Sequence, residues 1–178
     1  MEPITTYIKT CQALGVSEFC AQHLYPFLVH CVRSGSLKPI DVTRGLTVDR
    51  LQLEPRGESD EAGAGGADQY RVAPLRPRPP RLIGTISVGC SSSCDVQIND
   101  VSLSKVHAYA ERQGVTYMLW DNDSSAGTTV NGVRLEPGQK RELRPGDQMS
   151  LGYVDLIFLY PNQLYDLARM LYGSPLFR

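Results

Sequence analysis

Short stretches of alternating apolar and polar residues fill the middle of the chain, whereas apolar residues spaced three or four positions apart dominate its two ends. Alternation is typical of half-buried β-strands, and the wider spacing is typical of one face of an α-helix. Strands are predicted at 83–88, 96–98, 107–112, 116–120, 128–130, 133–135, 148–151 and 155–159, with turn residues between them. Short strands at this spacing predict an all-β sandwich, so the expected fold class is mainly β.

Both ends of the chain are predicted to be helical. A short helix is expected at 4–14, and a longer one begins with Ser17 as its N-cap and runs to Gly35. Pro26 lies inside this second helix and is expected to kink or split it, because proline has no backbone N–H to donate. A last helix is expected after Asn162 as its N-cap, with Gly173 just beyond its end.

This pattern divides the chain into four parts. Residues 1–45 form a small helical N-terminal region, 82–160 form the sandwich, and 161–178 form the C-terminal helix and tail. Residues 46–81 connect the first two, with a strand expected at 46–53 and the first sandwich strands allowed within 46–75. Within the connection, 56–68 is acidic and rich in Gly and Ala, so it buries too little apolar surface to offset the entropy of ordering and is predicted to be flexible. A short basic, proline-rich stretch follows at 76–81.

The composition narrows the classes of function. Hydrophobic residues make up 42% of the 178 residues and the formal net charge is −1, so neither nucleic acid nor a membrane is an expected partner. The N-terminus lacks a signal-peptide pattern and the five cysteines are an odd number, which favours a reducing, cytoplasmic location. The sequence has no nucleophile elbow, Gly-rich phosphate loop or His-Glu-x-x-His motif, so we expect no enzyme activity, no cofactor and no metal.

A series of short motifs runs through the predicted strands and turns. In order, they are Gly89-Cys90, Ser104-Lys105-Val106-His107, Asp121 through Ser124-Ser125-Ala126-Gly127-Thr128, Val130-Asn131-Gly132, Gly146-Asp147 and Leu151-Gly152. Asn131-Gly132 is also the strongest hairpin signal in the chain, because both residues accept a positive φ. The order and spacing of the series resemble those of the forkhead-associated (FHA) family, and the resemblance covers roughly residues 70–160.

The resemblance implies an FHA-like β-sandwich that binds phosphothreonine peptides through its loops and is not catalytic. It implies that Ser104 donates its hydroxyl to the phosphate, that Lys105 adds positive charge, and that Ser124 and Ser125 lie on the loop that meets the peptide. It also implies that His107 braces the loops from beneath without touching the ligand. The remaining motif residues would provide special backbone geometry: Gly89, Gly127, Asn131 and Gly132.

Two positions of the expected ligand face depart from the family pattern. Cys90 stands where the family has a phosphate-binding arginine, and Ala126 stands where it has an asparagine that holds the peptide backbone. Each lost contact is worth about 1.5–3 kcal/mol, so losing both would weaken phosphate binding a hundredfold or more. A cation from elsewhere, such as Arg134 or Arg112, would be needed to compensate.

The expected function is therefore protein–protein recognition in a signalling context, independent of phosphate or only weakly dependent on it. Bacterial FHA modules often act in such a context beside kinases or secretion machinery, which implies an adaptor of the bacterial type. Two alternatives stay open. One is true phosphothreonine-peptide binding through Ser104 and Lys105, and the other is a structural or oligomerisation platform that uses the apolar helices. The expected partner is a protein or a phosphothreonine peptide, and the oligomeric state is left open.

The cysteines raise two further possibilities. Zinc is bound by thiolate and imidazole groups, which the N-terminal region offers at Cys11, Cys20, His23, His30 and Cys31. No Cys-x-x-Cys pair occurs, however, and these cysteines fall on the apolar stripe, which favours a packing role. Cys90 and Cys94 lie on one predicted ligand loop, so a redox-sensitive pair is the second possibility.

Overall fold

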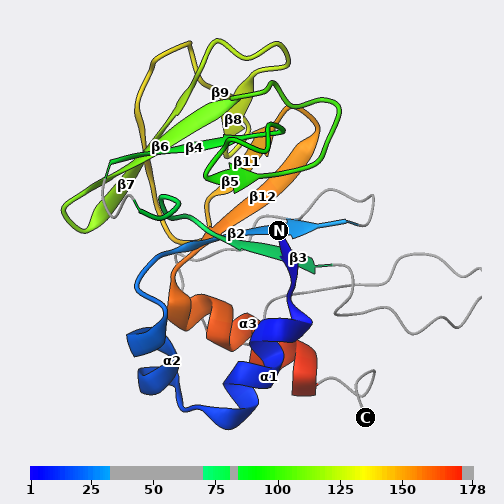
Figure 1. The fold of residues 1–178 in the computed structure, drawn as a ribbon, viewed down its shortest axis with the longest axis vertical. Helices are drawn as coiled ribbons and strands as arrows, with labels where there is room; N and C mark the ends of the chain where they lie inside the picture. Colours follow the sequence, from blue (N-terminus) through cyan, green and yellow to red (C-terminus); the bar gives the residue numbers. More distant parts are fainter. Residues whose placement is uncertain (33–69, 81–83, 174–178) are drawn as a thin grey trace, which may run out of the picture.

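The structure, a computed structural model, describes residues 1–32, 70–80 and 84–173 (Figure 1). In chain order the elements are β1 (Glu2–Pro3), α1 (Thr5–Ala13), α2 (Val16–Gln22), β2 (Phe27–Cys31), β3 (Tyr70–Pro74), β4 (Thr85–Gly89), β5 (Val96–Gln97), β6 (Ala108–Gln113), β7 (Thr116–Asp121), β8 (Thr128–Val130), β9 (Val133–Arg134), β10 (Arg141–Leu143), β11 (Gln148–Leu151), β12 (Val154–Leu159) and α3 (Pro161–Gly173). The larger sheet has the order β1-β3-β2-β12-β11-β8-β9, and the smaller sheet has the order β10-β7-β6-β4-β5. All neighbouring strands are antiparallel except β4 and β5.

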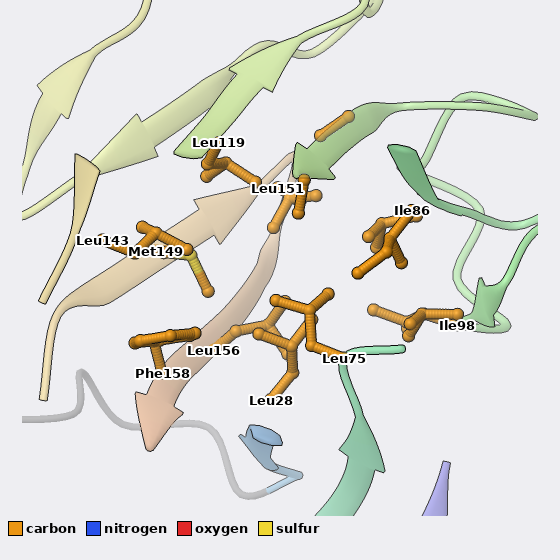
Figure 2. Close-up of a cluster of buried hydrophobic side chains, with 14 of the residues drawn as sticks. Leu28, Leu75, Ile86, Ile98, Leu119, Leu143, Met149, Leu151, Leu156 and Phe158 are labelled. Atoms are coloured by element: carbon orange, nitrogen blue, oxygen red, sulfur yellow. The ribbon is translucent and has the colours of Figure 1, made fainter. Parts of the chain in front are cut away.

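Two hydrophobic clusters hold three layers together. The first cluster lies between the two sheets and includes Leu156 and Phe158 of β12 (Figure 2). The second lies between the larger sheet and the three helices, and it includes Ile157 and Leu159 of the same strand. Successive residues of β12 therefore point into different cores, because side chains alternate across a strand. The result is a mainly β fold, a sandwich of two sheets with a helical layer on the outer face of one of them.

The helix predicted across residues 27–31 is wrong, because these residues form β2 in the middle of the larger sheet, between β3 and β12. Leu28 faces the first cluster while Phe27 and Val29 face the second, so all three are at most 2% exposed. A strand that is buried on both faces shows a continuous apolar run instead of alternation, and periodicity cannot distinguish such a run from a helix. The domain division at residue 45 therefore does not separate helices from the sandwich.

The helix boundaries also differ from the predicted ones. Helix α2 begins at Val16 and not after a Ser17 cap, and the N–H of Gly15 donates to Glu18 Oε2 over 3.2 Å. Helix α3 begins at Pro161, with Tyr160 and not Asn162 preceding the first helical residue. Proline is favourable at this first position because its missing N–H would have no partner within the helix. The N–H of Tyr160 donates to Gln163 Oε1 over 2.8 Å, which closes the start of the helix.

The strands predicted for the sandwich are observed with shifts of a residue or two at their ends. Residue 83, the strand expected at 46–53 and the connection at 56–68 lie outside the described residues. Strands β1 and β10 are elements that the sequence analysis did not predict, and both are three residues long or shorter. Within the described part of the chain, no helix has the length and apolar character needed to cross a membrane.

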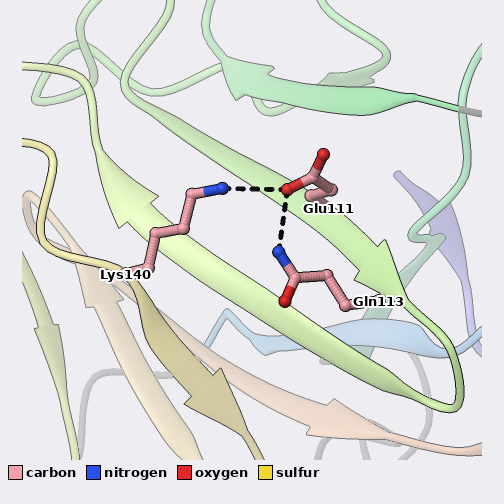
Figure 3. Close-up of polar contacts among 3 residues, drawn as sticks. All are labelled: Glu111, Gln113 and Lys140. Carbon is pink, nitrogen blue, oxygen red and sulfur yellow. Dashed lines mark hydrogen bonds and ion pairs between the residues drawn. The ribbon is translucent and has the colours of Figure 1, made fainter.

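The outer face of the smaller sheet carries polar and aromatic side chains. Lys140 Nζ lies 2.9 Å from Glu111 Oε2, and Gln113 Nε2 donates to the same oxygen over 3.2 Å (Figure 3). The Lys140 ammonium also lies 4.6 Å from the centre of the Trp120 ring, which in turn packs on Tyr109. Exposed ion pairs of this kind contribute about 0–1 kcal/mol, so the apolar clusters and not these pairs hold the sheets in place.

We predict that Leu28→Ala lowers the free energy of unfolding by about 2–5 kcal/mol, because it opens a cavity where β2 meets the core between the sheets. Urea denaturation measures the loss. The matched control is Leu24→Ala, a side chain that is 73% exposed, which should change stability by no more than about 0.5 kcal/mol. Equal effects of the two substitutions would contradict the placement of β2.

Candidate functional site

Three loops meet at one end of the sandwich, and Ser104 lies where they join. We call them loop A (90–95), loop B (98–107) and loop C (122–127). The N–H of Cys90 donates to the carbonyl of Ser104 and the N–H of Ser91 to that of Lys105, each over 3.1 Å, which links loops A and B. The N–H of Ser125 donates to Ser104 Oγ, also over 3.1 Å, which links loops B and C. We call the surface formed by Cys90, Ser104, Lys105, Ser125 and Ala126 the loop face.

Gly89 allows loops A and B to approach this closely. A Cβ atom at this position would lie 2.3 Å from the carbonyl oxygen of Lys105, so any side chain would push the two loops apart. The sequence analysis assigned Gly89 a backbone role, and the contact explains that role: the glycine is needed for space. Its carbonyl accepts the N–H of Ile98 over 3.0 Å, which anchors the start of loop B.

The buried His107 connects loops B and C from beneath. Its ring is 0% exposed, Nδ1 accepts the N–H of Ser104 over 3.2 Å, and Nε2 lies 3.1 Å from the carbonyl oxygen of Gly127. These partners require a neutral imidazole that carries its proton on Nε2. Burial lowers the pKa of His107, against the opposing effects of the Gly127 carbonyl and Asp121, so the neutral form is favoured. This geometry matches the bracing role that the sequence analysis expected.

Asp121 organises loop C, a role that the sequence analysis did not assign to it, although it placed the residue in the motif series. Its carboxylate is 3% exposed and accepts hydrogen bonds from Ser124 N–H over 2.8 Å, Ser124 Oγ over 2.7 Å and Thr128 Oγ1 over 2.6 Å. Burial raises the pKa of Asp121, but the hydrogen bonds from Thr128 and Ser124 lower it by more, so the pKa lies below its ordinary value. The available sequence signal was an acidic residue directly after a predicted strand and just before a Ser-rich turn.

Ser124 and Ser125 have different positions on loop C. The Ser124 hydroxyl donates to Asp121 and accepts the N–H of Gly127 over 3.0 Å, so it has no proton left for a ligand. Ser125 is exposed, and its N–H is already bonded to Ser104 Oγ. Of the two, only Ser125 therefore belongs to the loop face, and Ser124 braces the loop from within.

The polar side-chain groups of the loop face are the hydroxyls of Ser104 and Ser125 and the ammonium group of Lys105. Ser104 Oγ accepts the Ser125 N–H but donates to no acceptor among the described residues, so its proton is available to a ligand. Lys105 is exposed, and its ammonium has no partner in the described part of the chain. Cys90 is half-buried and packs against the cluster between the sheets, and Ala126 is half-buried beside Ser125.

The two arginines that the sequence analysis named lie at different ends of the sandwich. Arg112 Nε donates to the carbonyl of Gly114 over 2.8 Å at the turn between β6 and β7. The other ends of these strands, where Ala108 pairs with Asp121, lead into loops B and C, four residues or about 13 Å away. Arg134 instead lies against Gly127 of loop C, so only Arg134 lies next to the loop face.

Cys94, Cys11 and His23 are packing residues, and His30 Nδ1 lies 2.8 Å from the carbonyl oxygen of Asp155. Cys94 is 1% exposed, its Sγ lies 3.1 Å from the Lys105 carbonyl oxygen, and burial raises the pKa of its thiol, which disfavours the reactive thiolate. The five cysteines are free thiols. In the N-terminal region, the ring of His23 packs against Phe19, Tyr7 and Phe27, and Cys11 is buried in the helical cluster. Among the described residues, no three His, Cys, Asp or Glu side chains are grouped to hold a metal ion.

Asn131 and Gly132 form the turn between β8 and β9, as their sequence predicted. Both have positive φ values, 52° and 77° respectively. The Asn131 side chain also donates to Asp147 Oδ1 over 2.8 Å and accepts the N–H of Gln148 over 2.9 Å. The hairpin that carries Arg134 is therefore fastened at its tip.

The chain is similar in sequence and in fold to several known proteins. The sequence profile named FHA domain matches residues 86–152. An oxoglutarate dehydrogenase inhibitor from Corynebacterium jeikeium is 35% identical over 135 residues, which are 72% of this chain and 92% of the relative. Protein FraH from a Nostoc strain is 43% identical over 63 residues, which are 35% of this chain and 22% of FraH. The crystal structure of the FHA domain of CT664 from Chlamydia trachomatis superimposes with a TM-score of 0.47 and 17% identity, over 75% of this chain and 96% of that one.

The chain is much shorter than several of the relatives that it matches. It spans between 22% and 36% of the lengths of FraH and of two transcription factor 19 proteins, from Sus scrofa and Mus musculus. The shared segment in these proteins is therefore one part of a longer chain.

We predict that Asp121→Asn lowers the free energy of unfolding by about 2–3 kcal/mol, because the new amide group faces donors that need a carboxylate. Urea denaturation measures the loss, and amide hydrogen exchange should show faster exchange at Ser124 and Gly127. The control is Asp123→Asn, an exposed position with φ of 50° that asparagine tolerates, which should leave stability within about 0.5 kcal/mol. An unchanged Asp121→Asn protein would contradict the organising role.

We predict that the free energy of unfolding falls as the pH drops below about 6.5. The pKa values of His107 and His23 are lowered by burial in the folded protein, so between those values and 6.5 the unfolded chain binds more protons than the folded one. Each histidine contributes at most about 1.4 kcal/mol per pH unit in this range. Urea denaturation at pH 7.5 and 5.5 tests this in the wild type and in His23→Phe, where the part due to His107 should remain. A stability that rises on acidification would show the sign to be wrong.

Proposed function

The chain belongs to the FHA-domain family, whose members are non-catalytic protein-interaction modules, and on this basis we propose that its loop face binds a partner protein with weak or no dependence on phosphate. The observation that carries the proposal is the meeting of loops A, B and C at Ser104, above two buried polar residues, His107 and Asp121. A surface that is organised before binding loses little conformational entropy when a partner docks.

The weak dependence on phosphate follows from the side chains at the loop face. Family members recognise phosphothreonine with an arginine and an asparagine at the positions that are Cys90 and Ala126 here. Neither side chain donates a charge-assisted hydrogen bond, and the loss of two such contacts corresponds to about 3–6 kcal/mol. That loss is a hundredfold or more in the dissociation constant.

The name of one relative supports the proposal that the partner is a protein. The Corynebacterium jeikeium relative is named for inhibition of oxoglutarate dehydrogenase, so its name describes action on another protein. The identity of the partner in the present case is a separate question, since the chain spans only part of several relatives.

A second candidate is binding that requires phosphothreonine, with Ser104 and Lys105 as the main contacts. One observation favours it: among the described residues, neither the Ser104 hydroxyl nor the Lys105 ammonium has a partner that would prevent it from donating to a phosphate. In this candidate, phosphate accounts for most of the affinity, whereas in the first it accounts for little.

Two degenerate nonapeptide libraries test the proposal, one with a central threonine and one with a central phosphothreonine. We predict binding to the loop face with less than a tenfold preference for the phosphorylated library, measured by fluorescence anisotropy. Ser104→Ala should weaken binding at least fivefold, because it removes the hydroxyl and frees the Ser125 N–H that orders loop C. Ser17→Ala, on exposed helix surface far along the chain, is the control and should bind as the wild type does.

The possible outcomes separate the candidates. A preference of a hundredfold or more for phosphothreonine would replace the first candidate with the second. Binding that is unchanged in Ser104→Ala, or no binding to either library by a folded protein, would count against the loop face as the binding surface.

A further inference from the structure

An arginine from β9 lies beside the loop face at the place where the side chains expected by the family are missing. A Cβ atom at Gly127 would lie 2.4 Å from one terminal nitrogen of Arg134 and 2.5 Å from its Cζ. The guanidinium group therefore occupies the space that any side chain at position 127 would fill. Gly127 directly follows Ala126, so the guanidinium is next to the position that lacks the family's asparagine.

The position of Arg134 is set by the backbone around it. Arg134 pairs with Thr129 across the β8–β9 hairpin, whose tip is fastened by Asn131. Gly127 has a φ of +83°, which favours glycine, and its carbonyl is held by Nε2 of His107 and by the N–H of Gly152 over 3.0 Å. The surface on which the guanidinium rests is therefore well ordered, and it is tied to the same buried histidine that braces Ser104.

The side chain of Arg134 is exposed, and in the described residues it has no hydrogen-bond or ion-pair partner. Three other basic side chains near the sheets do have partners: Arg78 donates to the Ser92 carbonyl, Arg112 to the Gly114 carbonyl, and Lys140 to Glu111. What distinguishes Arg134 is the combination of free donors with a position against loop C. An unpaired guanidinium group that rests against a binding loop has its planar set of N–H donors free for a ligand.

We propose that Arg134 binds an oxyanion of the partner peptide and so supplies, from a different strand, the guanidinium group that Cys90 cannot. The inference rests on the proposed function, because it assumes that the loop face is where the partner binds. A guanidinium group binds phosphate and carboxylate oxygens in the same bidentate way, so the shared chemistry is an oxyanion on the peptide. Lys105 is a second cation on the same face, and Ser104 provides the hydroxyl donor.

The role differs from that of the family's arginine in a way that can be measured. Arg134 reaches the loop face from the side of loop C, whereas Cys90 lies on loop A. An oxyanion held by Arg134 would therefore lie near Ala126 and Ser125. This places charge recognition on the part of the ligand that loop C contacts, so a glutamate carboxylate at the central residue is read as well as a phosphate there.

The test uses Arg134→Gln, which removes the charge and keeps most of the side-chain length, with Arg134→Lys as the conservative variant. Arg112→Gln, an exposed arginine at the opposite end of β6, is the matched control. The probes are three degenerate nonapeptide libraries with threonine, phosphothreonine or glutamate at the centre, and Ser104→Ala is measured in parallel. Circular dichroism and urea denaturation confirm that each variant is folded.

We expect Arg134→Gln to weaken binding of the phosphothreonine and glutamate libraries at least fivefold while binding of the threonine library changes less than twofold. Arg134→Lys should recover part of the loss, and Arg112→Gln should bind as the wild type does. A loss confined to the phosphothreonine library identifies phosphate as the oxyanion, and a loss for both identifies any acidic group. The salt dependence of binding should also decrease in Arg134→Gln.

Two results would overturn the inference, and they differ in what they say about the proposed function. If Arg134→Gln binds all libraries as the wild type does while Ser104→Ala loses binding, the loop face is the binding surface and Arg134 plays no part. If neither variant alters binding, the proposed function fails together with the inference. An equal loss for all three libraries in Arg134→Gln would mean that the side chain supports the loop and does not recognise charge.

Discussion

The hydrogen bonds of the buried His107 ring are the constraint on which the loop face depends. A polar group that is removed from water must have its partners, and an unpaired buried donor or acceptor costs about 1–3 kcal/mol. The imidazole meets this requirement only when loop B presents the N–H of Ser104 on one side and loop C presents the carbonyl of Gly127 on the other. The buried carboxylate of Asp121 also needs hydrogen-bond donors, and it receives them from the N–H of Ser124 in loop C and from the hydroxyl of Thr128 just after that loop. Ser104 is thus placed by the polar groups beneath it and needs no ligand to hold it there.

The helical layer is part of the same fold and not an attachment to it. Strand β2 comes from the N-terminal part of the chain and lies between β3 and β12 in the larger sheet. Because the helices cover the outer face of these strands, Phe27 and Val29 bury a second set of contacts that a sandwich of two sheets alone would leave in water. The surface available to a partner is then reduced on that side. The loops at the end of the sandwich are not covered by the helices, and they carry the Ser104 hydroxyl and the Lys105 ammonium.

The loss of motif residues at this site does not remove all of the positive charge and hydrogen-bond donors that the site can offer. Cys90 and Ala126 remove two ligand contacts at the positions where the family places them, yet Arg134 brings a guanidinium group to loop C from β9, and this group has no partner within the described part of the chain. Gly127 makes this possible, because a side chain there would displace the arginine. A sequence motif records which residue stands at each position of the chain. A ligand is bound by charges and hydrogen-bond donors at particular points in space, and residues from elsewhere in the chain can supply them. The electrostatics of this face therefore follow from the hairpin as well as from the loops.

The sequence by itself determined the mainly β sandwich and its order of turns, because alternation and turn residues such as Asn131-Gly132 are local signals that persist in any context. The family came from the resemblance of the motif series, which also implied separate roles for Ser104 and His107. Only the tertiary structure decided that residues 27–31 are a strand, since burial on both faces erases the alternation that distinguishes strand from helix. It also decided that Ser124 faces inward and that Arg134, not Arg112, reaches loop C. These outcomes depend on which distant segments become neighbours, and spacing along the chain does not encode the direction in which a long side chain points.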